Sequence, residues 1–218
     1  MKRIVVGAWR LLAGLTVPSK ARNLRRLRAR GEKPDAFKIR EASAADIPAV
    51  ARLHVTAWNA TYAPLLMKGP SYDVRERQWR EAFARNEAGW FCFVVERPDG
   101  ELVAFAQGNR SDHPEFGGQL NKIYVLRDYQ RMGIGRRLLG HVARRFRKLG
   151  VNAMWLFGDA RNPSSRVWSA LGATKTDSDP GTGNYGWRDL DKLAALRDST
   201  DAGTPMQSAV SNRFGDIQ

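Results

Sequence analysis

Hydrophobic and polar positions alternate with two different periods from residue 37 onward, and the mixture predicts a domain of both strands and helices. Residues 37–41 alternate as a half-buried strand does. Ser43 to Asp46 has the pattern of a helix start before apolar positions at helical spacing. Residues 72–85 predict a second helix, so this part of the chain reads as one strand followed by two helices.

The middle of the chain predicts a β-hairpin. Two β-rich segments, 91–96 and 102–108, are joined by Arg97-Pro98-Asp99-Gly100, residues that favour a tight turn. The polar residues 109–118 predict a loop, and residues 119–125 predict a further strand.

The strongest helical pattern covers residues 133–149, and Gly150 is a natural stop. Beyond it we expect a buried strand at 153–157, a helix from about 163 to 171, and strand material near 173–177 and 184–189. The apolar face of the long helix consists of Leu138, Leu139, Val142, Ala143, Phe146 and Leu149.

Charge divides the chain into three parts. Residues 1–36 contain ten basic and two acidic side chains, a net +8 of the chain's +14, and we interpret them as a basic extension that is partly helical or disordered. Residues 37–196 form the predicted globular domain, a usual size for a single domain. The polar tail 197–218 is expected to be disordered.

The basic extension allows several interpretations. It could stay a solvated tail, contact an anionic surface or nucleic acid, lie on a membrane, or serve as an Arg-rich transit peptide. Its apolar stretch, 4–17, is interrupted by Arg10 and is shorter than a membrane span, and Ser19-Lys20-Ala21 is a poor signal cleavage site. We therefore expect no transmembrane segment and a cytoplasmic location.

The cysteine and the histidines predict no disulfide and no metal site. Cys92 is the single cysteine, and its place in an apolar run predicts a buried thiol in a reducing compartment. His54 and His141 are expected to be structural, and no His, Cys or Asp spacing predicts a metal site.

The turn before the long helix predicts an anion site. Gly133 and Gly135 remove side chains where the helix offers unpaired N–H groups and a partial positive charge. Arg131, Arg136 and Arg137 add charge, and no carboxylate lies between residues 129 and 150. The third glycine of a dinucleotide fingerprint and the Gly-Lys-Ser/Thr of a P-loop are both missing, which disfavours hydride transfer and nucleotide hydrolysis.

The stretch Gln130-Arg131-Met132-Gly133-Ile134-Gly135 resembles the Q/R-x-x-G-x-G/A signature of the GNAT superfamily of N-acetyltransferases, and the resemblance extends over about residues 37–192. It implies one α/β domain whose twisted, mostly antiparallel sheet is splayed between its fourth and fifth strands and flanked by helices. It also implies acetyl-CoA as co-substrate and no metal.

The resemblance further implies roles for individual residues. Backbone amides of 130–135 would hold the pyrophosphate of acetyl-CoA, the strand at 124–125 would bond the pantetheine arm, and Asn162 would line the thiol. The coenzyme-binding residues that it implies are Tyr124, Val125, Gln130, Arg131, Met132, Gly133, Ile134, Gly135, Arg136 and Asn162.

The usual proton-transfer residues of the family are missing. Gln119 stands where relatives often have Glu, and Trp168 where they often have Tyr, and neither replacement can transfer a proton near pH 7. Solvent could serve instead, with proximity supplying most of the acceleration. The candidate replacements are Asp112, His113 and Glu115 before Gln119, and Ser169 beside Trp168.

Three functions remain open. The leading one is acetyl transfer to a primary amine of a small molecule or peptide, by a monomer or homodimer. A non-catalytic coenzyme-A-binding or regulatory module and a basic nucleic-acid-associated protein are the alternatives. Four aromatic residues either line an acceptor pocket or belong to the core: Trp58, Tyr62, Trp79 and Trp90.

Overall fold

The structure is a computed structural model of the chain, and it describes residues 19–85, 87–162, 166–176 and 183–196. Its strands are β1 (Lys38–Glu41), β2 (Phe91–Glu96), β3 (Leu102–His113), β4 (Phe116–Val125), β5 (Met154–Leu156), β6 (Thr174–Lys175) and β7 (Tyr185–Trp187). Its helices are α2 (Lys20–Ala29), α3 (Ile47–Tyr62), α4 (Tyr72–Arg85), α5 (Ile134–Lys148), α6 (Arg166–Ala170) and α7 (Asp191–Ala194), and short 3-10 turns include η1 (Pro34–Ala36), η2 (Ala44–Asp46), η3 (Ala63–Leu65) and η4 (Arg127–Tyr129).

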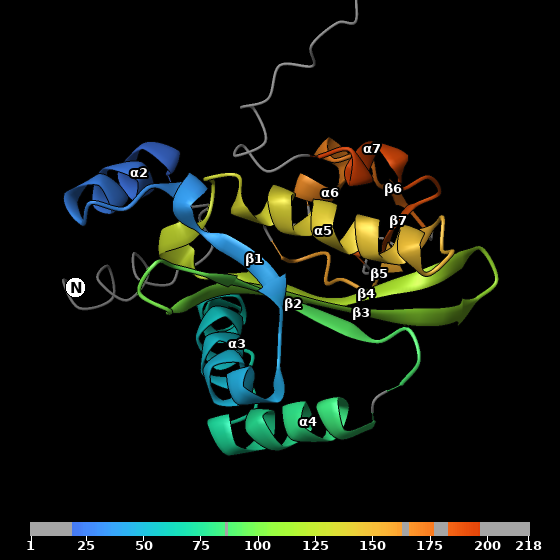
Figure 1. The fold of residues 1–218 in the computed structure, drawn as a ribbon, viewed down its shortest axis with the longest axis horizontal. Helices are drawn as coiled ribbons and strands as arrows, with labels where there is room; N and C mark the ends of the chain where they lie inside the picture. Colours follow the sequence, from blue (N-terminus) through green and yellow to red (C-terminus); the bar gives the residue numbers. More distant parts are fainter. Residues whose placement is uncertain (1–18, 86, 163–165, 177–182, 197–218) are drawn as a thin grey trace, which may run out of the picture.

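One sheet of seven strands organises the domain, in the order β1-β2-β3-β4-β5-β7-β6. Every neighbouring pair is antiparallel except β4 and β5, which run parallel. Helices α3 and α4 cover one face of the sheet, and α5 crosses the other (Figure 1). This confirms the predicted mixed α/β fold with a mostly antiparallel sheet between helices.

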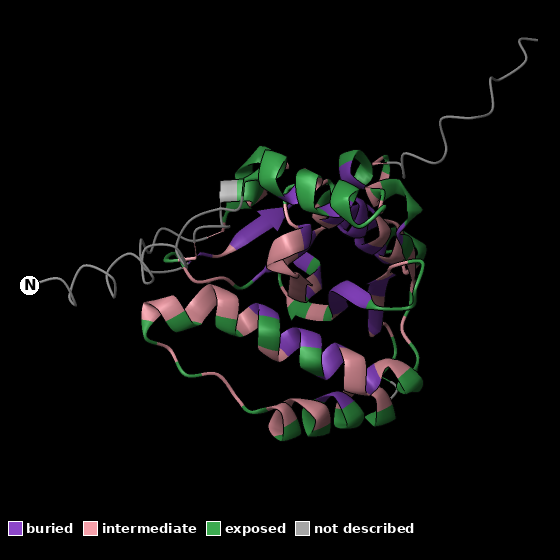
Figure 2. Cartoon of the chain, turned by 90° about the vertical axis from the view of Figure 1, so that its left-hand side faces the viewer, coloured by how far each residue is buried: buried purple, intermediate pink, exposed green. Residues whose placement is uncertain are grey.

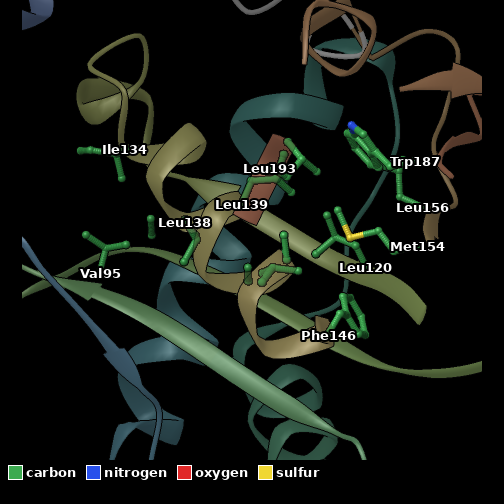
Figure 3. Close-up of a cluster of buried hydrophobic side chains, with 14 of the residues drawn as sticks. Val95, Leu120, Ile134, Leu138, Leu139, Phe146, Met154, Leu156, Trp187 and Leu193 are labelled. Atoms are coloured by element: carbon green, nitrogen blue, oxygen red, sulfur yellow. The ribbon is translucent and has the colours of Figure 1, made fainter. Parts of the chain in front are cut away.

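Helix α5 supplies the larger core cluster. Its apolar stripe packs on the sheet together with residues of β5, β7 and α7, and Figure 3 shows Leu138, Leu139 and Phe146 among them. The strands beneath carry glycine where the helix comes closest, because a Cβ on Gly118 would lie 2.8 Å from the Phe146 ring. Buried positions are concentrated in the sheet and on the helix sides that face it (Figure 2).

The second cluster fills the space between the sheet and the α3–α4 pair. It includes Cys92, which is fully buried and free, as expected from its apolar run. Burial raises the pKa of its thiol. The chain enters α3 through a capping box in which Ser43 and Asp46 satisfy each other's backbone donors, so the predicted helix start is confirmed.

The prediction of a loop over residues 109–118 is wrong. Strand β3 continues to His113 and β4 begins at Phe116, so a tight turn replaces most of the polar loop. These polar residues pair across the hairpin, for example Asn109 with Gln119 and Arg110 with Gly118. A strand face that lines a polar pocket does not show the apolar alternation by which strands are recognised.

The described part of the basic extension packs on the domain. Leu27 of α2 is 2% exposed and belongs to the α5 cluster. Arg26 forms an ion pair with Asp128 at 2.5 Å, so part of its charge is used internally. Residues 1–18, with the apolar stretch, and the tail 197–218 lie outside the described residues, and the division of the chain at residues 36 and 196 remains a prediction. Within the described ranges, no helix combines the length and apolarity that crossing a membrane requires.

Candidate active site

The connection between β4 and α5 forms a fixed loop. After Val125 the chain makes the η4 turn, and the Gln130 side chain donates back to the Val125 carbonyl at 2.9 Å. Arg131 then adopts a left-handed conformation with φ of 66°. Such a conformation costs a non-glycine residue about 1–3 kcal/mol and persists only where neighbours impose it. The loop is therefore held in one shape before the helix begins.

The extension helps to hold that loop. Asn23 of α2 is 1% exposed, and its Nδ2 donates to the carbonyls of Arg127 at 2.9 Å and of Gln130 at 3.1 Å. One buried amide thereby ties two turns of the loop together. No pattern in the sequence predicts this role, because Asn23 precedes the loop by about a hundred residues and belongs to the segment interpreted as a basic extension.

The N-terminus of α5 is open. Its N-cap is Gly133, with φ of 83°, which offers no side chain to the first turn, and that turn contains no acidic residue. A Cβ added at Gly133 would meet nothing within 4 Å. Beside it lies a cavity of about 270 Å³ lined by Met132, Gly133 and Arg136 among others. The expectation that these amides are not capped by the chain's own side chains, and that they border a cavity, agrees with this geometry.

The arginines near this helix end have different surroundings. Arg131 is exposed, and Arg136 is exposed and borders the cavity. Arg137 is buried and donates to the carbonyls of Pro34 and Phe37, both at 3.0 Å, which ties the end of the extension to α5. The positive helix end and Arg136 therefore remain available to an anion such as a diphosphate.

Strands β4 and β5 separate next to this helix end. They pair only at Gly118 with Met154 and Gln119 with Trp155. In the described chain, residues 120–125 of β4 have β3 on one side and no strand on the other. Because the Leu126 N–H donates to the Val103 carbonyl, the antiparallel register turns the backbone groups of Tyr124 toward β3 and those of Val125 toward the open edge. There the Val125 N–H can bond an extended ligand that runs from the α5 N-terminus toward Gln119.

The residues expected near the thiol lie beyond β5. The Nδ2 of Asn162 donates to the Tyr62 hydroxyl at 3.3 Å, which joins this turn to the end of α3. Trp168 packs edge-to-face on Trp187, with ring centroids 6.1 Å apart, so its role is packing. Ser169 is exposed on α6.

The candidate bases before Gln119 lie at the tip of the β3–β4 hairpin. Asp112 is exposed, and Glu115 is exposed and paired with Arg188 at 2.9 Å. The ring of His113 packs on Trp155 and its Nδ1 accepts from the Glu115 amide. None of the three lines either cavity described here. Their catalytic assignment stays a prediction, without support from the cavity geometry.

A second cavity opens on the α3–α4 face of the same strands. It has a volume of about 410 Å³ and is lined by residues of α3, α4, the α4–β2 connection, β3 and β4, among them His54, Trp79, Trp90 and Lys122. Two of the four aromatic residues with an undecided role thus line a pocket, although Trp79 is also part of the core. Cross-strand partners share a face, so Gln119, opposite Asn109, lies on this side as well.

His54 is buried in the wall of this pocket. Its ring contacts those of Trp79, Phe105 and Tyr124, and its Nδ1 has no hydrogen-bond partner within the described chain. Burial, with nearby Arg75 and Lys122, lowers its pKa to about 3, so the imidazole is neutral at pH 7. The expectation that His54 is structural agrees with this position.

Sequence reasoning missed Lys122 and Arg75, which lie in this pocket. Lys122 is on the same strand face as Tyr124, so a lysine at an inward position of a strand was the available signal. Arg75 gave no such signal, since α4 is rich in charged residues. No group of three or more metal-ligating side chains occurs in the part of the chain that the structure describes.

The comparisons with known proteins agree with this geometry. Residues 50–173 match the profile of the acetyltransferase (GNAT) family, and the chain belongs to that family of acyltransferases. Among its relatives is the uncharacterized N-acetyltransferase YuaI of Bacillus subtilis (strain 168), 29% identical over 176 residues that cover 72% of this chain and 96% of YuaI. The probable N-acetyltransferase Rv2775 of Mycobacterium tuberculosis is 29% identical over 113 residues, 49% of this chain and 63% of the relative.

Solved structures share the fold. The PaiA N-acetyltransferase from Thermoplasma acidophilum, in complex with coenzyme A, superposes with a TM-score of 0.58 at 17% identity, covering 69% of this chain and 97% of PaiA. YncA from Salmonella typhimurium, solved with acetyl-CoA, gives a TM-score of 0.51 at 23% identity, covering 71% and 94%. At these identities the likeness concerns the fold alone.

Proposed function

We propose that this chain transfers the acetyl group of acetyl-CoA to a primary amine, with both substrates bound together. The observation that carries the proposal is the uncapped N-terminus of α5 beside a cavity, in a chain of the acetyltransferase family. The coenzyme in the PaiA and YncA structures is further support, because both share this fold.

The residues present fit the coenzyme. The amides of Ile134, Gly135 and Arg136, with the Arg131 and Arg136 side chains, would hold the diphosphate. The open edge of β4 at Tyr124 and Val125 would align the pantetheine arm, and Asn162 would lie near the thiol. Gly133 leaves the space beside the helix end empty of side chain.

The chain's contribution to the reaction is binding, orientation and proton handling. When bound, acetyl-CoA would supply a thioester at which the uncharged amine forms a C–N bond while the C–S bond breaks. The nitrogen gives up one proton, and the sulfur leaves with the electron pair and takes up one proton. Holding both reactants in place can supply about 7–11 kcal/mol of the barrier reduction, so a missing carboxylate at Gln119 still permits turnover.

Tyr62 is the proposed proton donor in place of the tyrosine absent at Trp168. Its hydroxyl accepts from Asn162 Nδ2 at 3.3 Å, and this hydrogen bond does not use the phenolic proton. Burial raises the pKa of Tyr62, so it is protonated at pH 7. A positioned acid of this kind contributes about 10²–10⁴-fold in rate.

Two measurements on the full chain test the proposal. Isothermal titration should detect acetyl-CoA binding at submillimolar concentration, and a thiol-release assay over amine classes should find turnover. Absence of binding contradicts the coenzyme assignment. Binding without thiol release from any amine would favour a non-catalytic coenzyme-A-binding module.

A further inference from the structure

The pocket on the α3–α4 face carries more positive than negative charge. Its lining includes Arg75, Arg85 and Lys122 against one carboxylate, Glu87. Arg85 pairs with Glu87 at 3.5 Å, so these two compensate each other. Arg75 and Lys122 are both partly buried, and neither has a carboxylate within 4 Å among the described residues. Two cations in the same pocket therefore lack a counter-charge.

The two cations have only neutral partners. Lys122 Nζ donates to Gln107 Oε1 at 3.1 Å and lies 5.6 Å from the centroid of the Trp79 ring. Arg75 Nη1 donates to Gln78 Oε1 at 2.9 Å, while its Nε is buried with no partner in the described chain. Burial lowers the pKa of both groups. Buried charges in proteins ordinarily have a partner of opposite charge. Two neighbouring cations without one therefore point to an anionic ligand.

Neutral polar groups complete the same wall. A bulge in β4 places Asn121 between the registered pairs of β3 and β4, and its side chain donates to Asn109 Oδ1. Both amides line the pocket, as does His54 with its unpartnered Nδ1. The volume of about 410 Å³ lies in the range of pockets that enclose small molecules, roughly 300–1,000 Å³.

The pocket also adjoins the proposed reaction centre. Asn121 and Lys122 belong to the stretch of β4 that has no partner on the β5 side in the described chain. This is the edge along which the pantetheine arm would run, so a molecule in the pocket would lie next to the proposed path of the thioester.

We infer that the acceptor is a small amine that also carries an anionic group, a carboxylate or a phosphate, and that Arg75 and Lys122 bind this group. The inference rests on the proposed acetyl transfer and names its substrate class. Arginine and lysine are the usual ligands of both oxyanions. The same two charges repel a polyamine, so the pocket selects against acceptors that are only cationic.

The first test compares matched amines in the thiol-release assay with saturating acetyl-CoA. Amino acids are set against their carboxamides, phosphoethanolamine against ethanolamine, and spermidine serves as the cationic extreme. We expect kcat/KM for an anionic acceptor to exceed that of its neutral counterpart by about 100-fold. The carboxylate and phosphate pairs show which oxyanion is preferred. Equal or better use of spermidine or of the neutral amines overturns the inference.

Substitutions locate the effect. Lys122→Met and Arg75→Met should each raise KM for the anionic amine by about 30-fold or more and leave the Kd of acetyl-CoA unchanged. Arg80→Met is the matched control, because Arg80 lies on the same helix, is exposed, pairs with Glu76 and is not among the pocket residues. A preference for anions that survives both pocket substitutions also overturns the inference.

A binding readout separates this inference from the proposed function. N-acetylated amino acids and their amides are titrated into the chain without coenzyme, and the side-chain amide signals of Asn109 and Asn121 are followed by NMR. Shifts with the acids at tenfold lower concentration than with the amides support the anion site even if acetyl-CoA fails to bind, which would remove only the proposed function. No preference for the acids contradicts the anion site.

Discussion

The α5 N-terminus and the pocket on the α3–α4 face border the same strand, yet they are built differently. The first is almost contiguous, since residues 124–136 contain the strand end, the loop and the helix start. The second is assembled from α3, α4, β3 and β4, which are separated by as much as seventy residues. The proposed function assigns the coenzyme, which is common to the family, to the contiguous site, and the acceptor to the assembled one. A site shared by the family can therefore be recognised in one short stretch of sequence, whereas the residues that select the acceptor cannot.

The largest expected effect concerns Tyr62, at the end of α3 beside Asn162. Tyr62→Phe removes the proposed proton donor and should lower kcat about 100-fold. The Kd of acetyl-CoA should not change, because Tyr62 does not border the α5 N-terminus. Single-turnover kinetics and isothermal titration measure the two quantities.

Tyr72→Phe is the control, since Tyr72 packs near Arg52 and has no described contact with Asn162. A kcat that is unchanged in Tyr62→Phe would show that solvent protonates the sulfur.

The second prediction uses two glycines at opposite ends of α5. Gly133 and Gly150 both have positive φ, 83° and 74°, and a Cβ at either would meet nothing within 4 Å. Alanine at each should cost about 1 kcal/mol of stability from the left-handed backbone. Only Gly133→Ala should weaken acetyl-CoA binding, by about 30-fold.

Equal coenzyme affinity in Gly133→Ala and Gly150→Ala would show that the α5 N-terminus does not receive the diphosphate. Urea midpoints for both variants confirm that the strain is matched.

The third prediction concerns pH and the buried imidazole in the pocket wall. The folded pKa of His54 is about 3, against 6.5 for an ordinary histidine, because it is buried and lies near the positive charges of Arg75 and Lys122. The unfolded chain takes up a proton below pH 6.5 and the folded chain does not, so stability is fully present above pH 6.5 and is lost as pH falls toward 3.

Between pH 7.5 and 4.5 this group should lower the unfolding free energy of the native chain by about 3 kcal/mol. In His54→Phe the fall in unfolding free energy between pH 7.5 and 4.5 should be smaller than in the unsubstituted chain by about this amount. Urea unfolding at both pH values measures it. Identical pH dependence in the two proteins would contradict the buried neutral state.

The smallest effect concerns the hydrogen bonds from Asn23 of the extension to the loop between β4 and α5. Asn23→Ala removes two hydrogen bonds to the carbonyls of Arg127 and Gln130, which should cost about 1–2 kcal/mol of stability. The loop should also hold the diphosphate less well, with acetyl-CoA affinity lowered about threefold. Exposed Arg22→Ala on the same helix should leave both values unchanged, and matching losses in the two variants would refute the positioning role.

Most of the fold could be predicted from the sequence, since the strands and helices with clear periodicity were confirmed, α4 and β2 with the bounds expected. The hairpin tip could not, because residues 109–113 are all polar and show no alternation of apolar and polar positions. The helix-opening glycines could be recognised locally. Asn23, Arg75 and Lys122 could not be assigned, because their roles depend on neighbours that only the folded chain brings close.

The most direct test of the central claim follows the backbone amides of the full chain by NMR during titration with acetyl-CoA and, separately, with acetyl-pantetheine, which lacks the diphosphate. We predict that the signals of Gly133, Ile134, Gly135 and Arg136 shift strongly with acetyl-CoA and stay in place with acetyl-pantetheine. Coenzyme binding that leaves these four amides unmoved would contradict the account.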